Sequence, residues 1–115
     1  MRLLNVCAAL SGLAALIMLV LAAHAIQPSA EDLERIKLAA FLQLGAAAAS
    51  LAIANRSGRL NFIAGALILA GAAIFAGTLY ALAITHQRTF VLLAPVGGIT
   101  LILGWAVLLF ARPGA

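Results

Sequence analysis

The chain has 115 residues, of which 66% are hydrophobic and 9% are charged, and its formal net charge is +4. Ordinary soluble domains are about 45–50% apolar and about 25% charged. A soluble domain of this length would expose much of its apolar surface to water, because small domains bury a smaller share of their surface than large ones. The composition therefore excludes an ordinary soluble fold and indicates a protein whose solvent is the lipid bilayer.

The basic charge balance does not indicate nucleic-acid binding. The seven Lys and Arg residues are scattered near the ends of apolar runs and form no basic stripe, which such binding requires. At these positions their side chains can reach lipid phosphates. The single cysteine, Cys7, excludes an intramolecular disulfide and a cysteine-based metal cluster. We expect neither a metal nor a cofactor.

Four apolar segments predict four transmembrane helices. The first, residues 3–26, contains no charged residue, and about 20 apolar residues are enough to cross a bilayer as a helix. The breaks between the segments are short, so that consecutive helices are antiparallel. We therefore predict an all-α integral membrane four-helix bundle with up-down-up-down topology, a single transmembrane domain over residues 1–115. The remaining helices are expected at about 30–54, 60–85 and 90–111.

The first segment also resembles a secretory signal peptide. Arg2 supplies a basic start, and Ala23-His24-Ala25 fits a small-x-small cleavage site. The apolar run is longer than the apolar region of a signal peptide, which is typically about 7–15 residues. We expect the segment to be retained as a helix, and cleavage is the alternative.

The segment between the first two helices is polar. Ser29 and Asp32 have the spacing of a capping box, which predicts that the second helix begins near Ala30. Residues three or four apart share a helix face, so opposite charges at these spacings can pair. We interpret the segment as a solvated helix start, with a docking surface as the alternative. The expected pairs are Glu31 with Arg35 and Glu34 with Lys37.

The basic residues that flank the helices give a small orientation bias. Cytoplasmic loops carry an excess of Lys and Arg, whereas acidic residues contribute little to this rule. The bias of four against three favours a cytoplasmic location for both termini. One side carries Arg2, Arg56, Arg59 and Arg112, and the other carries Arg35, Lys37 and Arg88.

Small residues on every helix predict close helix packing. Helices in a bilayer associate through small residues, because lipid tails are as apolar as leucine. Gly65, Gly71 and Gly77 recur every six residues, which places them on several sides of the third helix. We therefore expect the third helix to be central. The glycines expected in helix packing are Gly12, Gly45, Gly65, Gly71, Gly77 and Gly104.

No Asp, Glu, Lys or Arg lies inside an apolar run, and intramembrane charges are what mark proton relays and ion pathways. Neither histidine has a carboxylate at a helical spacing, and we find no catalytic constellation, so we predict that the protein is not an enzyme. Several polar residues, together with a proline and two glycines that can leave helix backbone groups unpaired, nevertheless share the membrane half nearer the first loop. They form a candidate polar layer, with interfacial anchoring and interhelical hydrogen bonds as the alternative. Its members are His24, Gln43, Thr78, Tyr80, Pro95, Gly97 and Gly98.

Three motifs in the second half of the chain resemble a known family. They are AGTLYALA at residues 76–83, APVGG at residues 94–98 and Gly-Trp at residues 104–105. They resemble the signature of the small bacterial membrane family labelled domain of unknown function 423, to which eukaryotic transmembrane protein 256 is also similar. The end of the first helix, AAHA at residues 22–25, partly matches the Gly-Ala-His-Gly of that family, and the second helix lacks its histidine. The resemblance implies four transmembrane helices in the inner membrane and no established activity.

These observations together predict a non-enzymatic accessory or interaction protein of the inner membrane. Its expected partners are the lipid bilayer and either other membrane proteins or further copies of itself. The alternative is a small oligomeric transporter or channel for a neutral or apolar solute, with Gln43, Thr78 and Tyr80 lining the pathway. A lipid-handling enzyme is a third hypothesis, and the sequence offers no catalytic groups for it.

Overall fold

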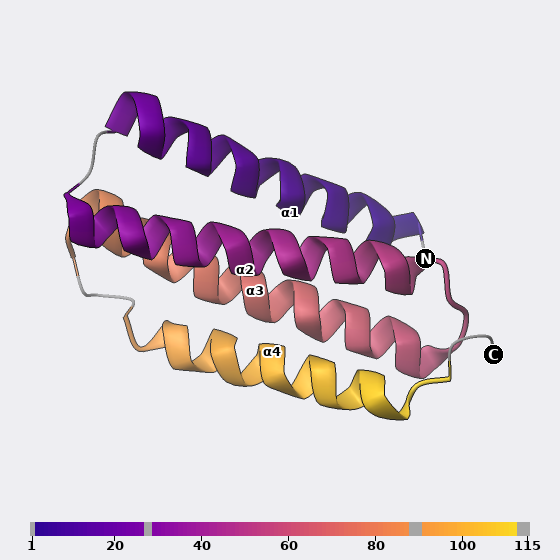
Figure 1. Cartoon of the computed structure of the whole chain (residues 1–115). Helices are drawn as coiled ribbons and strands as arrows, with labels where there is room; N and C mark the ends of the chain where they lie inside the picture. The colour runs from indigo at the N-terminus through magenta and orange to yellow at the C-terminus, as the bar shows by residue number, and fades with distance from the viewer. Residues whose placement is uncertain (1, 27–28, 88–90, 113–115) are drawn as a thin grey trace.

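The computed structural model describes residues 2–26, 29–87 and 91–112. In this part of the chain four helices follow one another, and all four are long and apolar enough to cross a membrane. The predicted all-α bundle with up-down-up-down topology is confirmed (Figure 1). The elements are α1 (Arg2–Leu21), which continues into a π-helical turn η1 (Ala22–Ile26), α2 (Ala30–Ala54), α3 (Arg59–Thr85) and α4 (Leu93–Phe110).

Local chemistry sets the helix ends. α2 begins at Ala30, as predicted, because the side chain of Ser29 accepts a hydrogen bond from the backbone N–H of Asp32. α3 ends at Thr85 because His86 adopts a left-handed conformation with φ 59°, and its N–H bonds the carbonyl of Leu82. α4 begins at Leu93, later than the predicted residue 90, which lies outside the described residues. Pro95 thus lies in the first turn of α4, where a missing N–H removes no helix hydrogen bond.

The helices form a flattened bundle of 47 × 26 × 18 Å. Each helix packs against the next one in the chain, so that α2 and α3 lie in the middle and α1 and α4 lie at the two edges (Figure 1). α3 contacts α2, α4 and also α1. It is therefore the helix with the most neighbours, as the spacing of its glycines predicts.

The core consists mainly of alanines with a few isoleucines and leucines, and most of the larger apolar side chains face outward. Leu92 and Leu109 are 80% and 82% exposed. This distribution suits a bilayer, where large side chains gain nothing by leaving the lipid and small ones let helices approach. Fully buried alanines occur on three of the helices, among them Ala8, Ala15, Ala39, Ala40, Ala64 and Ala72.

The closest helix contact joins α3 to α4 at three glycines. A Cβ atom on Gly71 would lie 2.5 Å from the backbone nitrogen of Leu101, and a Cβ on Gly97 would lie 2.5 Å from the nitrogen of Phe75. A Cβ on Gly104 would lie 2.7 Å from the nitrogen of Ile68. Because the obstructing atoms are backbone, these positions have no room for any side chain.

The other glycines differ in their surroundings. Gly65 lies under the side chains of Leu4 and Ile53, and Gly12 faces Ala47 at ordinary contact distance. Gly45 and Gly77, which we expected in helix packing, instead have open space where a Cβ would be. The described helices therefore leave both glycines uncovered, and the apolar pattern of α2 and α3 does not indicate which face meets a neighbour.

Candidate functional site

One group of polar side chains joins three helices inside the membrane-spanning part. Gln43 on α2 is 7% exposed. Its side-chain oxygen accepts a hydrogen bond of 2.7 Å from the hydroxyl of Tyr80 on α3. Its side-chain NH₂ donates a hydrogen bond of 3.1 Å to the hydroxyl of Ser11 on α1. We call these three residues the Gln43 network.

The Gln43 network satisfies its own polar atoms. Leaving a polar group without a hydrogen-bond partner in hydrocarbon costs several kcal/mol of free energy, so that each donor must find an acceptor inside the protein. Among the described residues, every buried side-chain nitrogen and oxygen has a hydrogen-bond partner. Interhelical hydrogen bonds of this kind contribute about 0.6 kcal/mol on average. The network therefore links α1 to α2 and α2 to α3 through side-chain hydrogen bonds.

The candidate polar layer comes together only in part. Of its seven members, the structure joins Gln43 and Tyr80 and adds Ser11, which the sequence analysis did not include. The remaining five lie outside this network. His24 is exposed in η1, and the hydroxyl of Thr78 donates to the carbonyl of Ile74 in its own helix at 2.7 Å. The other three lie on α4. Pro95 is in its first turn, Gly97 packs on Gly71, and Gly98 faces open space.

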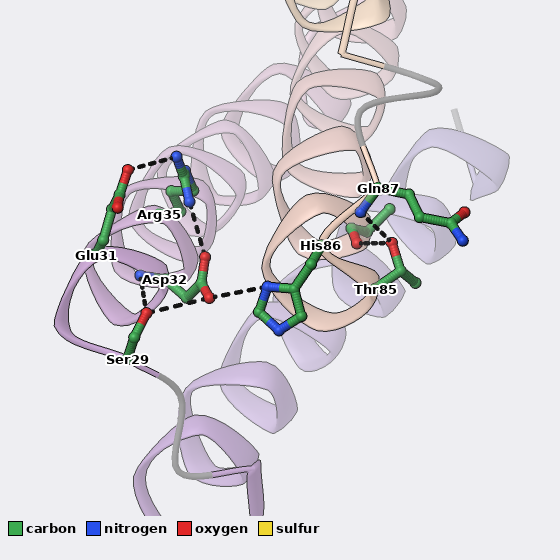
Figure 2. Close-up of polar contacts among 8 residues, drawn as sticks. Ser29, Glu31, Asp32, Arg35, Thr85, His86 and Gln87 are labelled. Carbon is green, nitrogen blue, oxygen red and sulfur yellow. Dashed lines mark hydrogen bonds and ion pairs between the residues drawn. The ribbon is translucent and has the colours of Figure 1, made fainter.

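A second polar group lies at the end of the bundle near the first loop (Figure 2). Asp32 is only 4% exposed although it carries a carboxylate. It accepts a hydrogen bond of 2.8 Å from Arg35 and one of 3.2 Å from the hydroxyl of Ser29. Arg35 also contacts Glu31 at 2.7 Å, as predicted, whereas the structure does not form the expected pair of Glu34 with Lys37. We call Ser29, Glu31, Asp32, Arg35 and His86 the Asp32 cluster.

His86 connects this cluster to α3. Its Nδ1 atom lies 3.4 Å from Oδ2 of Asp32, and its ring points toward that carboxylate in Figure 2. The sequence analysis missed this contact because it searched for carboxylates at helical spacings only. A signal was present, since in an up-down-up-down bundle the start of α2 and the end of α3 lie on the same side.

The Asp32 cluster does not have the geometry of a nucleophilic site. Such a site needs a base within hydrogen-bond reach of the nucleophile and a third group that orients the base. Here the hydroxyl of Ser29 and the ring of His86 both face the same oxygen of Asp32. Among the described residues, no group of three or more His, Cys, Asp or Glu side chains could hold a metal ion. The cluster links the start of α2 to the end of α3 through the contact of Asp32 with His86.

A third polar group lies at the opposite end, around Asn61, which is 2% exposed. Its side-chain NH₂ donates to the carbonyl of Ser57 at 2.9 Å and to the carbonyl of Arg112 at 2.8 Å. Its oxygen accepts a hydrogen bond of 3.2 Å from Arg56. One buried amide thus ties the turn between α2 and α3 to the chain after α4. Asn61 lies in the third apolar segment and was not among the predicted site residues.

Comparisons with known proteins agree with this architecture. Residues 20–98 match the family described as protein of unknown function DUF423. A segment of 39 residues is 44% identical to the UPF0382 inner membrane protein YgdD of Escherichia coli K12 and covers 34% of this chain and 30% of that protein. A segment of 48 residues is 44% identical to the UPF0382 membrane protein SERP0230 of Staphylococcus epidermidis and covers 42% of this chain and 39% of that protein.

These matched segments span less than half the length of the curated relatives. No solved structure matches the chain. The family match covers more than half of the chain and includes two of the three motifs on which the resemblance was based. With its four apolar helices, the chain is a membrane protein that belongs to the DUF423 family.

Proposed function

We propose that the protein is a non-enzymatic accessory protein of the inner membrane that binds a transmembrane helix of another membrane protein. The observation that carries this proposal is the open space beside Gly77 on α3. Gly77 is exposed on the membrane-spanning part of α3, and nothing lies within 4 Å of the position that its Cβ would occupy.

Gly77 belongs to an outward-facing row of small residues. Ala73 and Ala81 lie four positions before and after it and therefore share its helix face. The three residues line a hollow of about 330 Å³, to which α4 contributes Leu93. We call Ala73, Gly77 and Ala81 the outer α3 face. Small residues at this spacing allow the backbone of a second helix to approach closely.

The outer α3 face is separate from the face that binds α4. Gly71 and Gly77 are six residues apart, a rotation of about 600°, so that their directions differ by about 120° around the helix. Gly71 is occupied by the backbone of α4, whereas Gly77 has no neighbour within 4 Å. A partner helix could therefore bind at Gly77 without displacing α4.

The polar residues support a structural role for the membrane interior. Thr78 also lines the hollow, but its hydroxyl already donates to the carbonyl of Ile74. Gln43 and Tyr80, which the transporter hypothesis would place along a pathway, bond each other. These contacts support the accessory role over a polar pathway, and they support the proposal that the protein is not an enzyme.

The charge distribution supports an orientation with both termini in the cytoplasm. Arg2, Arg56, Arg59 and Arg112 lie at one end of the bundle. Among the described residues the other end carries Arg35 and Lys37, so that the first end has the larger number of basic residues. Excess basic residues mark the cytoplasmic side of a membrane protein.

Copurification from native membranes tests the proposal. Wild-type protein is expected to retain a different membrane protein, and Gly77→Leu is expected to lose it, because a leucine fills the contact that the partner needs. Gly98→Leu is the matched control, since Gly98 is also open but lies on α4. Equal retention by both variants would refute the role of the outer α3 face. Recovery of a homo-oligomer with a polar lumen would favour the transporter instead.

A further inference from the structure

The arginine end of the bundle carries positive charge that no acidic side chain compensates. We use this name for the end with Arg2, Arg56, Arg59 and Arg112. The only acidic residues of the chain are Glu31, Asp32 and Glu34, near the start of α2. Twenty residues of helix separate Glu34 from the end of α2 at Ala54, which is about 30 Å at 1.5 Å per residue. Charges of opposite sign that far apart are largely screened, because the Debye length is about 8 Å at physiological ionic strength.

Two of these arginines line one hollow. Arg59, at the start of α3, and Arg112, after α4, border a hollow of about 280 Å³ between the ends of the two helices. Both arginines are exposed. Asn61 borders the same hollow, and its side-chain NH₂ donates to the backbone carbonyl of Arg112. This bond holds the backbone at Arg112 beside the start of α3, where Arg59 lies.

The rest of the hollow is partly apolar. Leu60 and Phe110 also line it, and they are 49% and 78% exposed. Both belong to membrane-spanning helices, at the ends where the chain leaves the bilayer. A ligand that fits this hollow therefore has a negatively charged group for the arginines and an apolar part that continues along Leu60 and Phe110 into the lipid.

We infer that the hollow binds one anionic phospholipid, with the phosphate between Arg59 and Arg112 and the acyl chains along Leu60 and Phe110. The forked guanidinium group suits the oxygens of a phosphate. Phospholipid phosphates lie at the membrane surface, where the arginine end of the bundle is also expected, and they supply the negative charge that this end lacks. The inference does not depend on the accessory function proposed above.

Lipid binding by the purified full chain in a non-ionic detergent tests this inference. Phosphatidylglycerol and phosphatidylcholine are titrated separately, and bound lipid is counted by native mass spectrometry. We expect tighter binding of phosphatidylglycerol to the wild type. Each arginine near an anionic lipid strengthens binding about fivefold, so that Arg59→Gln with Arg112→Gln should weaken it roughly 25-fold.

The control is Arg2→Gln, which removes one positive charge at the same end, because Arg2 does not line the hollow. It should change binding less than about twofold, because a charge outside the hollow acts on the lipid only over a distance at which salt screens it. The double lysine variant, Arg59→Lys with Arg112→Lys, should keep the preference for phosphatidylglycerol, because it keeps both charges. Equal binding of the two lipids by wild-type protein would overturn the inference. So would a loss with Arg2→Gln as large as that with the double glutamine variant.

Discussion

Gly97 and Gly98 are neighbours on α4 that should respond in opposite ways to the same substitution. In Gly97→Ala the new Cβ would lie 2.5 Å from the backbone nitrogen of Phe75 and 2.9 Å from the carbonyl oxygen of Gly71. These atoms belong to the backbone of α3 and can move only if the two helices separate. In Gly98→Ala the new Cβ meets no atom within 4 Å.

The size of the effect follows from this geometry. Overpacking a well-packed contact costs about 1–3 kcal/mol, so Gly97→Ala should lower the free energy of unfolding by about that amount. Gly98→Ala should instead raise it by up to about 1 kcal/mol, because the new Cβ meets no neighbour and alanine favours a helix over glycine. The two variants have identical composition, so that any difference between them comes from the position of one methyl group.

Unfolding by a denaturing detergent, followed by the fluorescence of Trp105, measures both variants. Trp105 is the only tryptophan of the chain and lies on α4 beside Gly104, which packs on α3. Circular dichroism in the same samples checks that the helices persist. Equal stability of the two variants would refute the close backbone contact between α3 and α4.

Three further predictions concern the polar groups. In a double-mutant cycle, Gln43→Leu and Tyr80→Phe should show a coupling energy of about 0.6 kcal/mol and at most about 1.7 kcal/mol, and no coupling would contradict their hydrogen bond. Ser29→Ala should destabilise the protein by about 1 kcal/mol through loss of the cap of α2, measured by thermal unfolding, and an unchanged midpoint would disagree with that cap. Asn61→Ala removes a buried amide that bonds the carbonyls of Ser57 and Arg112 and should cost about 1–3 kcal/mol, whereas Asn55→Ala, an exposed matched control, should cost clearly less in the same assay.

Composition and short-range signals were enough to predict the four helices and their antiparallel order. The start of α2 could be predicted because Ser29 and Asp32 are close in the sequence and form a local motif. The predicted start of α4 at residue 90 was less accurate. The apolar run there continues on both sides of the true helix start at Leu93, so that hydrophobicity alone does not mark it.

The rotation of each helix could not be predicted from the sequence. A helix that is apolar on all sides has no periodic pattern to separate its core face from its lipid face. Gly71 and Gly77 therefore looked equivalent, although one touches the backbone of α4 and the other faces open space. The two glycines differ in the structure because α4 packs against the side of α3 that carries Gly71.

The contacts of Asp32 with His86 and of Asn61 with Arg112 were missed for a related reason. Each joins residues that are far apart in the chain and that meet only after the helices have packed. Gln43 and Tyr80 were predicted at a common depth, which follows from counting residues along antiparallel helices. Their direct hydrogen bond depends on helix rotation and became visible only in the structure.

Photocrosslinking in intact membranes tests the accessory function most directly. A photoreactive amino acid replaces Ala73 on the outer α3 face or, as a control, Leu109, which is 82% exposed on α4. The proposed function predicts a crosslink to one other membrane protein from position 73 and only lipid adducts from position 109. Lipid adducts alone from both positions would contradict it.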